Sequence, residues 1–223
     1  MNKLPPITKN LLIINVLCLM GTMALSKYGL DLHKLLGLHF FLSPGFRIWQ
    51  PVTYMFLHDG FSHIFFNMFA VWMFGRIMEA EWGSKRFLIF YLLCGLGAAF
   101  MQEMCQFIHF EMLTAGVNDD LYIDILRYMP LTVGASGAVY GILLGYGMTY
   151  PDNQLFIIPF PFPIKAKWLV TAYVVIELGL GIRGNAADNV AHFAHLGGML
   201  TGFLIMLYWK HKERKDNHIK FTW

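Results

Sequence analysis

The sequence predicts an all-α integral membrane protein with six membrane-spanning helices. Of its 223 residues, 57% are hydrophobic and only 14% are charged, whereas about a quarter of a soluble domain is charged. The mean hydropathy is +0.50. Several stretches of about 20 residues carry no charge, and this is the length that an α-helix needs to cross the hydrocarbon core of a bilayer. We therefore expect lipid to surround most of the chain.

Six apolar stretches are long enough to be spans. In order they are residues 9–27, 61–81, 86–108, 134–150, 166–183 and 190–209. We interpret the first as a retained helix, because it lacks a convincing small-x-small cleavage site and further spans follow it. The chain then forms one membrane domain over 1–223, with an N-terminal segment 1–8, a six-helix core 9–209 and a basic tail 210–223. An even number of spans puts both termini on one side.

The basic residues predict which side that is. If the termini are cytoplasmic, twelve of the seventeen lysines and arginines fall at the inner face, and positive residues favour that face. These twelve are Lys3, Lys9, Arg76, Lys85, Arg86, Lys165, Lys167, Lys210, Lys212, Arg214, Lys215 and Lys220. The outer five are Lys27, Lys34, Arg47, Arg127 and Arg183. We expect a multi-pass protein of a bacterial inner membrane with cytoplasmic ends.

Two outer connections are longer than a hairpin requires. The connection 28–60 is rich in apolar residues, which suits an element that lies in the membrane interface. These residues are Leu35, Leu36, Leu38, Phe40, Phe41, Phe46, Ile48 and Trp49. The connection 109–133 is acidic and ends in Pro130, shortly before a glycine cluster. We expect the first connection to be embedded and the second to be a connecting segment.

Small residues predict close helix contacts. Gly137, Gly141 and Gly145 recur every four residues in the fourth span, and Gly198 and Gly202 do so in the sixth. Such spacing lets a neighbouring backbone approach closely.

Two functional classes have little support. Cys18, Cys94 and Cys105 form no CxxC pair and no metal-finger spacing, so they are interpreted as buried apolar residues. The cations lie at segment ends rather than on an aromatic-interleaved basic face, which argues against nucleic-acid binding. We expect no cofactor and no metal, and the sequence carries no signal for an oligomeric state.

Polar side chains are costly inside a bilayer, so each one in a span is a candidate functional residue. The candidates are His63 and Asn67 in the second span, Ser136 in the fourth, and His192 and His195 in the sixth. His63, Ser136 and His195 lie 15 or 16 residues from the inner ends of their spans. At about 1.5 Å per residue, all three are roughly 22 to 24 Å above the inner boundary. They should meet at one level in the outer half of the membrane.

A serine and a histidine at one level suggest a nucleophile and its general base, because an unassisted hydroxyl is a weak nucleophile. Ser136 lies between Gly134 and Gly137 at the start of a helix, where free backbone N–H groups stabilise a developing oxyanion. His63 and Asn67 are four residues apart, so both could direct donors at the same oxyanion.

Tyr140 lies one turn after Ser136 on the same helix face, where its ring could hold the imidazole of His195. No aspartate lies near His195 within its span. The sequence therefore predicts a Ser-His dyad rather than a triad.

Other interpretations stay open. Each serine or histidine could serve helix packing alone, and His58 and His192 are assigned such structural roles. The four imidazoles of His58, His63, His192 and His195 could instead hold zinc, although the sequence shows no HExxH motif and no obvious carboxylate ligand. A transporter has thinner support, because no pair of interrupted helices occurs in matching halves.

Three motifs together resemble the rhomboid intramembrane serine proteases over residues 45 to 210. They are His63-Ile64-Phe65-Phe66-Asn67, then Gly134-Ala135-Ser136-Gly137 with Tyr140, then Ala194-His195-Leu196-Gly197-Gly198 with Gly202. Glu79 in Gly75-Arg76-Ile77-Met78-Glu79 resembles a structural GxxxE element of that family. Many members have Trp-Arg where this chain has Trp49-Gln50, so no salt bridge from this loop to a carboxylate such as Glu79 is assumed.

The resemblance implies that Ser136 is the nucleophile and His195 the base. It implies that His63 and Asn67 serve the oxyanion site and that Tyr140 stacks on the base. It also implies a six-helix core, an embedded first loop, and transmembrane protein substrates cut at small residues within the bilayer. An inactive relative that only binds client helices is a further alternative, which the intact Ser136 and His195 pair disfavours.

Overall fold

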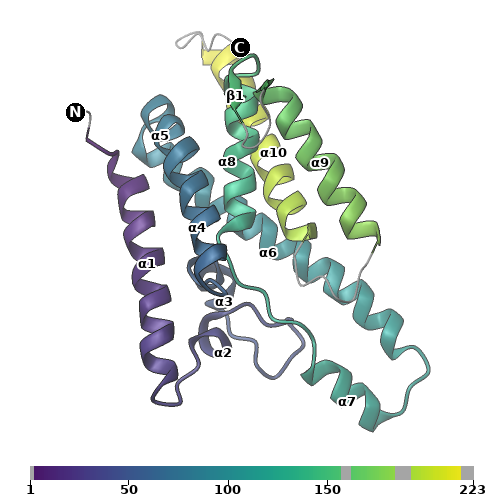
Figure 1. Ribbon diagram of the computed structural model, residues 1–223. Coiled ribbons are helices and arrows are strands. Elements are labelled where there is room, and N and C mark those ends of the chain that lie inside the picture. The colour runs from purple at the N-terminus through teal and green to yellow at the C-terminus, as the bar shows by residue number, and fades with distance from the viewer. Residues whose placement is uncertain (1–2, 157–161, 184–191, 217–223) are drawn as a thin grey trace.

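The computed structural model describes residues 3–156, 162–183 and 192–216. These residues form a bundle of helices with one small hairpin of two antiparallel strands (Figure 1). The helices are α1 (Pro6–Ser26), α2 (Leu32–Leu36), α3 (Gln50–Thr53), the 3₁₀ turn η1 (Tyr54–Phe56), α4 (Phe61–Ala70), the π-turn η2 (Val71–Gly75), α5 (Arg76–Trp82), α6 (Ser84–Thr114), α7 (Asp119–Arg127), α8 (Ser136–Thr149), α9 (Ala166–Arg183) and α10 (His192–Asp216). The strands are β1 (Gln154–Phe156) and β2 (Pro163–Lys165).

All six stretches predicted as spans are helical where the structure describes them. The second is a continuous run of α4, η2 and α5, and the other five correspond to α1, α6, α8, α9 and α10. Within the described part of the chain, α1 and α6 are the helices that are long and apolar enough to cross a membrane by themselves. Residues 190–191 of the predicted sixth span, and Lys220 in the tail, lie outside the described residues.

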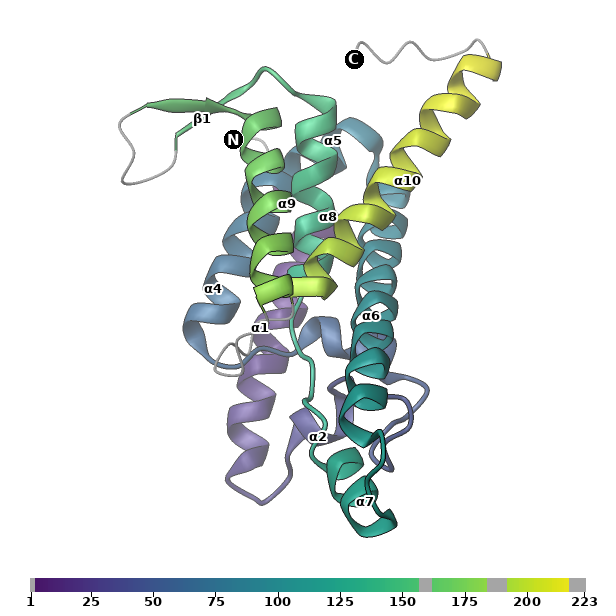
Figure 2. The ribbon, with the colours of Figure 1, turned by 90° about the vertical axis from the view of Figure 1, so that its right-hand side faces the viewer.

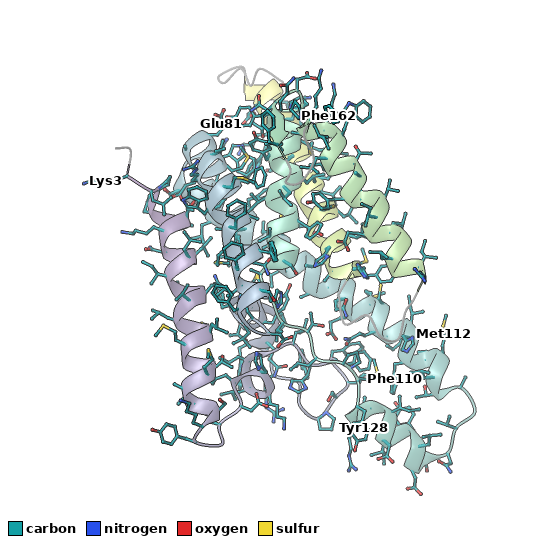
Figure 3. All side chains as sticks on the ribbon, viewed as in Figure 1. Lys3, Glu81, Phe110, Met112, Tyr128 and Phe162 are labelled. Atoms are coloured by element: carbon teal, nitrogen blue, oxygen red, sulfur yellow. The ribbon has the colours of Figure 1, made fainter. Side chains whose placement is uncertain are left out.

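The first and last helices mark one end of the bundle. The start of α1 and the end of α10 lie at the same end of the bundle, whereas α2 and α7 lie at the opposite end (Figures 1 and 2). Figure 3 shows Lys3, Glu81 and Phe162 at the first end and Met112 and Tyr128 at the other. The elements at the first end also carry the basic residues assigned to the inner face, among them the start of α6 and the hairpin that precedes α9.

The centre of the bundle consists of α6, α8 and α10, and Figure 2 shows α10 crossing the other helices obliquely. The glycines predicted to allow close contacts lie at these crossings. A Cβ added at Gly198 would overlap the backbone of Gly137, and one added at Gly141 would lie 2.6 Å from Sγ of Cys94. The predicted close approach of the fourth and sixth spans is therefore confirmed.

The first connection is partly core rather than wholly interfacial. Leu38 and Phe40 are fully buried, whereas Ile48 is 87% exposed. Buried Gln50 holds this segment together, because its Oε1 accepts from the backbone N–H groups of His39 and Arg47 and its Nε2 donates to carbonyl oxygens of the same loop. The glutamine that follows Trp49 thus supplies hydrogen bonds within the loop.

The second connection contains a helix that the sequence did not predict. Asn118 caps the start of α7 by accepting the N–H of Leu121, acidic residues occupy its first turn, and Arg127 lies in its last turn. Each of these features suits the helix dipole. The preceding helix α6 also extends to Thr114, beyond the predicted end at 108.

Glu79 caps helix α1 from a neighbouring helix. No side chain near Pro5 caps the start of α1. Instead, the buried carboxylate of Glu79 accepts the backbone N–H groups of Ile7 and Thr8 and the hydroxyls of Thr8 and Ser84, at 2.7 to 2.9 Å. The first turn of any helix has N–H groups without internal acceptors, and this carboxylate satisfies two of them. Glu79 therefore connects α1 to the rest of the bundle.

We predict that Glu79→Ala lowers the free energy of unfolding by about 3 kcal/mol, since hydrogen bonds to a charged group are lost and buried donors are left unpaired. Thermal unfolding in detergent measures the effect. The control is Glu81→Ala, which removes an equal charge from the exposed side of the same helix. Equal unfolding temperatures for the two variants would contradict the capping role.

Candidate active site

Ser136 and His195 meet across two helices. Ser136 is the first residue of α8, and His195 lies in the first turn of α10. Oγ of Ser136 and Nε2 of His195 are 2.8 Å apart, which is a hydrogen-bond distance. His195 is buried and Ser136 is half-buried. The two residues predicted to share one level are therefore in direct contact.

The turn before Ser136 is held by the first loop. Leu38 and Thr132 exchange two backbone hydrogen bonds of 2.9 and 3.0 Å, and the N–H of Gly134 donates to the carbonyl of Tyr54 at 3.0 Å. Gly134 has φ of +128°, a conformation that favours glycine. A Cβ at this position would also lie 2.8 Å from Nε2 of His63. Gly134 therefore allows both the sharp turn and the approach of His63.

Tyr140 lies where the one-turn spacing predicted. Its ring stacks on the imidazole of His195, with centroids 4.2 Å apart and planes within 10° of each other. This contact restricts the tilt of the imidazole while leaving its edge directed at Ser136.

His63 and Asn67 lie on the same side of the site. Nδ1 of His63 accepts the N–H of Asp59 at 3.2 Å, which places the proton of the neutral ring on Nε2. That nitrogen faces Gly134. Nδ2 of buried Asn67 donates to the carbonyl of His63 at 3.0 Å and has a second N–H available. His63 thus offers a donor beside Gly134, and Asn67 offers one in the cavity that Ser136 also lines.

A cavity of about 1640 Å³ gives access to this group. Ser136, His63, Asn67 and His195 all line it. Its sides include α4, η2 and α9 and are mainly apolar, with Phe65, Phe69, Met73, Leu169 and Tyr173 among them. The polar group therefore lies within a mainly apolar cleft.

The sequence interpretation missed Glu177. This buried carboxylate comes from α9 and lies on the far side of His195 from Ser136. Its Oε2 is 3.0 Å from Nδ1 of His195 and 2.6 Å from Nδ1 of His192, and its Oε1 accepts the hydroxyl of Tyr140 at 2.5 Å. The signal was present, because Glu177 is the acidic residue of the predicted fifth span.

Two statements about carboxylates are corrected by this finding. No aspartate of the sixth span lies near His195, but a carboxylate of the adjacent helix α9 does. The statement that no carboxylate accompanies His192 and His195 is also wrong, since these two and Glu177 hold ligand-type atoms within 4.8 Å of one another. This is the group that could hold a metal among the described residues.

The zinc site with four imidazoles is not formed. His58 and His63 pack edge to face with ring centroids 4.9 Å apart, but neither belongs to the group around Glu177. Burial, followed by the neighbouring His63, lowers the pKa of His58 to about 3. His58 is therefore a neutral, buried residue at the start of α4.

The arrangement has the parts of a nucleophilic catalyst. A hydroxyl contacts an imidazole, the imidazole is held by an aromatic ring, and donors surround the place where negative charge would develop. Such a site can carry out acyl transfer.

The comparisons with known proteins agree with this chemistry. Residues 45–212 match the family model described as the rhomboid domain. The chain is 29% identical over 174 residues to "Rhomboid protease AarA" of Providencia stuartii, covering 76% of this chain and 59% of that protein. It is 28% identical over 155 residues to "Rhomboid protease GluP" of Bacillus subtilis, covering 70% and 25%.

A mitochondrial relative, "Presenilin-associated rhomboid-like protein" of Bos taurus, is 28% identical over 164 residues, covering 71% of this chain and 38% of that protein. The chain thus spans less than two thirds of the length of each of these relatives. The family model, in contrast, matches most of the chain, including every residue of the site described above. The chain is an α-helical membrane protein that belongs to the rhomboid family.

Proposed function

We propose that this chain is an intramembrane serine endopeptidase that hydrolyses peptide bonds in or near the transmembrane helices of other membrane proteins. The observation that carries the proposal is the 2.8 Å contact between Ser136 and His195 in an apolar cleft. Membership of the rhomboid family supports it.

The reaction is an acyl transfer in two stages. His195 takes the hydroxyl proton of Ser136 on Nε2 while Oγ attacks the substrate carbonyl. The carbonyl oxygen becomes an oxyanion, which the first N–H groups of α8 and the Nε2–H of His63 stabilise, together with Asn67. His195 then protonates the leaving amine, the peptide bond breaks, and an ester to Ser136 remains. Water, deprotonated by His195, hydrolyses this ester and regenerates the serine.

The membrane setting supports this substrate class. We assign the six long helical segments to six crossings, with the basic end of the bundle and both termini in the cytoplasm and a bacterial inner membrane as the location. The site then lies in the outer half of the bilayer, and water reaches it from the outer face. The mainly apolar cleft between α4 and α9 suits a helix arriving from the lipid.

The substrate must expose its backbone before it is cut. A helical carbonyl is engaged in a hydrogen bond and shielded by its own helix. Residues that weaken a helix, such as glycine, let the segment unwind into the cleft. Small residues at the cleaved bond therefore fit both the need to unwind and the close quarters around Gly134.

We predict that a fluorophosphonate probe labels the wild-type protein and fails to label Ser136→Ala, because the probe needs an activated hydroxyl. In-gel fluorescence measures the labelling. Ser62→Ala is the control, since Ser62 lines the same cavity without contacting His195. Labelling that survives in Ser136→Ala would refute the assignment of the nucleophile.

We predict that His63→Ala lowers kcat for cleavage of a reconstituted transmembrane substrate by about 100-fold, with little change in KM, because one oxyanion donor is lost. Initial rates at several substrate densities separate the two constants. His109→Ala serves for comparison, since this exposed imidazole lines the same cavity. A fall in affinity at unchanged kcat would assign His63 to substrate binding instead.

A further inference from the structure

We propose that Glu177 is a positioning residue for the general base, so that this chain holds His195 with a buried carboxylate in addition to the stacked tyrosine. The inference rests on the proposed function, and it concerns a residue that acts through His195 rather than on the substrate. It makes α9 a part of the catalytic apparatus, in addition to α4, α8 and α10.

The placement of Glu177 is the first step. Its carboxylate lies at the nitrogen of His195 that faces away from Ser136, with Oε2 3.0 Å from Nδ1. The imidazole thus has an acceptor on one edge and the nucleophile, 2.8 Å away, on the other. The hydroxyl, the imidazole and the carboxylate thus follow one another across one ring, which is the order of roles in a serine, histidine and acid arrangement.

The contact selects a tautomer. An ionised carboxylate only accepts hydrogen bonds, so it favours a proton on Nδ1 of His195. The lone pair of the neutral ring is then on Nε2, where it can receive the proton of Ser136. Without an acceptor at Nδ1, the ring is free to carry its proton on Nε2, and in that form it cannot act as the base.

The strength of the contact should rise during turnover. Nδ1 of His195 makes an ion-pair contact with Glu177 rather than an aligned hydrogen bond, whereas Nδ1 of His192 makes a short one of 2.6 Å to the same oxygen. A neutral imidazole is attracted to the carboxylate less strongly than a charged one is. The imidazolium formed when Ser136 attacks is attracted to the carboxylate through a medium that screens charge poorly, so the interaction favours the transition state.

Glu177 also holds the other partner of His195. The hydroxyl of Tyr140 donates to Oε1, and the ring of Tyr140 stacks on the imidazole. One carboxylate therefore restrains the base at its edge and, through the tyrosine, at its face. His192 in turn fixes the carboxylate, which gives this histidine a specific place in the network.

A metal is the rival explanation for this group, and the distances disfavour it. Two atoms bound to one tetrahedral zinc at about 2.0 to 2.1 Å are roughly 3.3 Å apart. The 2.6 Å between His192 and Glu177 is shorter and matches a charge-assisted hydrogen bond. These distances favour hydrogen bonds and ion pairs over metal ligation in this group.

The test uses the full chain in detergent with ¹⁵N-labelled histidine. We expect the His195 ring of the wild-type protein to carry its proton on Nδ1, the signal being identified by its loss in His195→Ala. In Glu177→Gln we expect a mixture of the two tautomers, and a kcat about 100-fold lower at a KM within about threefold of wild type. A residue needed for folding alone would lower the amount of active protein without changing the tautomer.

Each other outcome overturns the proposal. A proton on Nε2 of wild-type His195 does so even if Glu177→Gln fails to fold, and so does an unchanged kcat in a folded variant. Stoichiometric zinc in the purified protein, with its removal by chelator shifting the His192 and His195 signals, assigns the group to a metal instead. Ser136→Ala distinguishes a failure of the proposed function from a failure of the role given to Glu177. If Ser136→Ala still cleaves the substrate, the protease proposal fails. If Ser136→Ala is inactive and Glu177→Gln is fully active, only the role of Glu177 fails.

Discussion

The close approach of α8 and α10 is the contact on which the site depends. Gly137 and Gly198 leave no room for a side chain between the two backbones. Ser136 is next to the first glycine and His195 is one turn before the second, so the spacing of the backbones sets the distance between hydroxyl and imidazole. A hydrogen bond of 2.8 Å tolerates little change in that spacing. The two glycines therefore allow close helix packing and also set the distance between Ser136 and His195. Glycine is unfavourable within a helix, and this close contact explains its presence here.

A buried carboxylate is the second constraint. Removing a charge from water costs several kcal/mol unless hydrogen bonds and opposite charge compensate for it. Glu79 and Glu177 solve this problem in different ways. The first receives backbone and hydroxyl donors and acts as a helix cap, whereas the second receives a phenol and two imidazoles. The groups around Glu177 are themselves titratable, whereas most of those around Glu79 are not. This difference fits the role that we propose for Glu177.

The sequence predicted those parts of the site that depend on spacing within one helix. Helical rise predicted that Ser136 and His195 meet, and the one-turn separation predicted that the ring of Tyr140 holds the imidazole; both contacts are present. Glu177 was missed because its contact depends on how α9 is rotated about its own axis, and no periodicity encodes that. The burial of Leu38 and Phe40 was missed for a related reason: an apolar run predicts removal from water, but it does not distinguish lipid from protein as the new surroundings.

The first loop also shapes the turn that carries Ser136. Its buried residues hydrogen-bond to Thr132 and Gly134, which precede the nucleophile, and Gln50 organises the same loop from within. Tyr54 adds a hydrogen bond of 2.7 Å from its hydroxyl to the carbonyl of Gly95 on α6. The turn that presents Ser136 therefore takes its shape from a segment far away in sequence. Since an oxyanion site requires donors fixed within a few tenths of an ångström, the packing of this loop contributes to the geometry of the reaction.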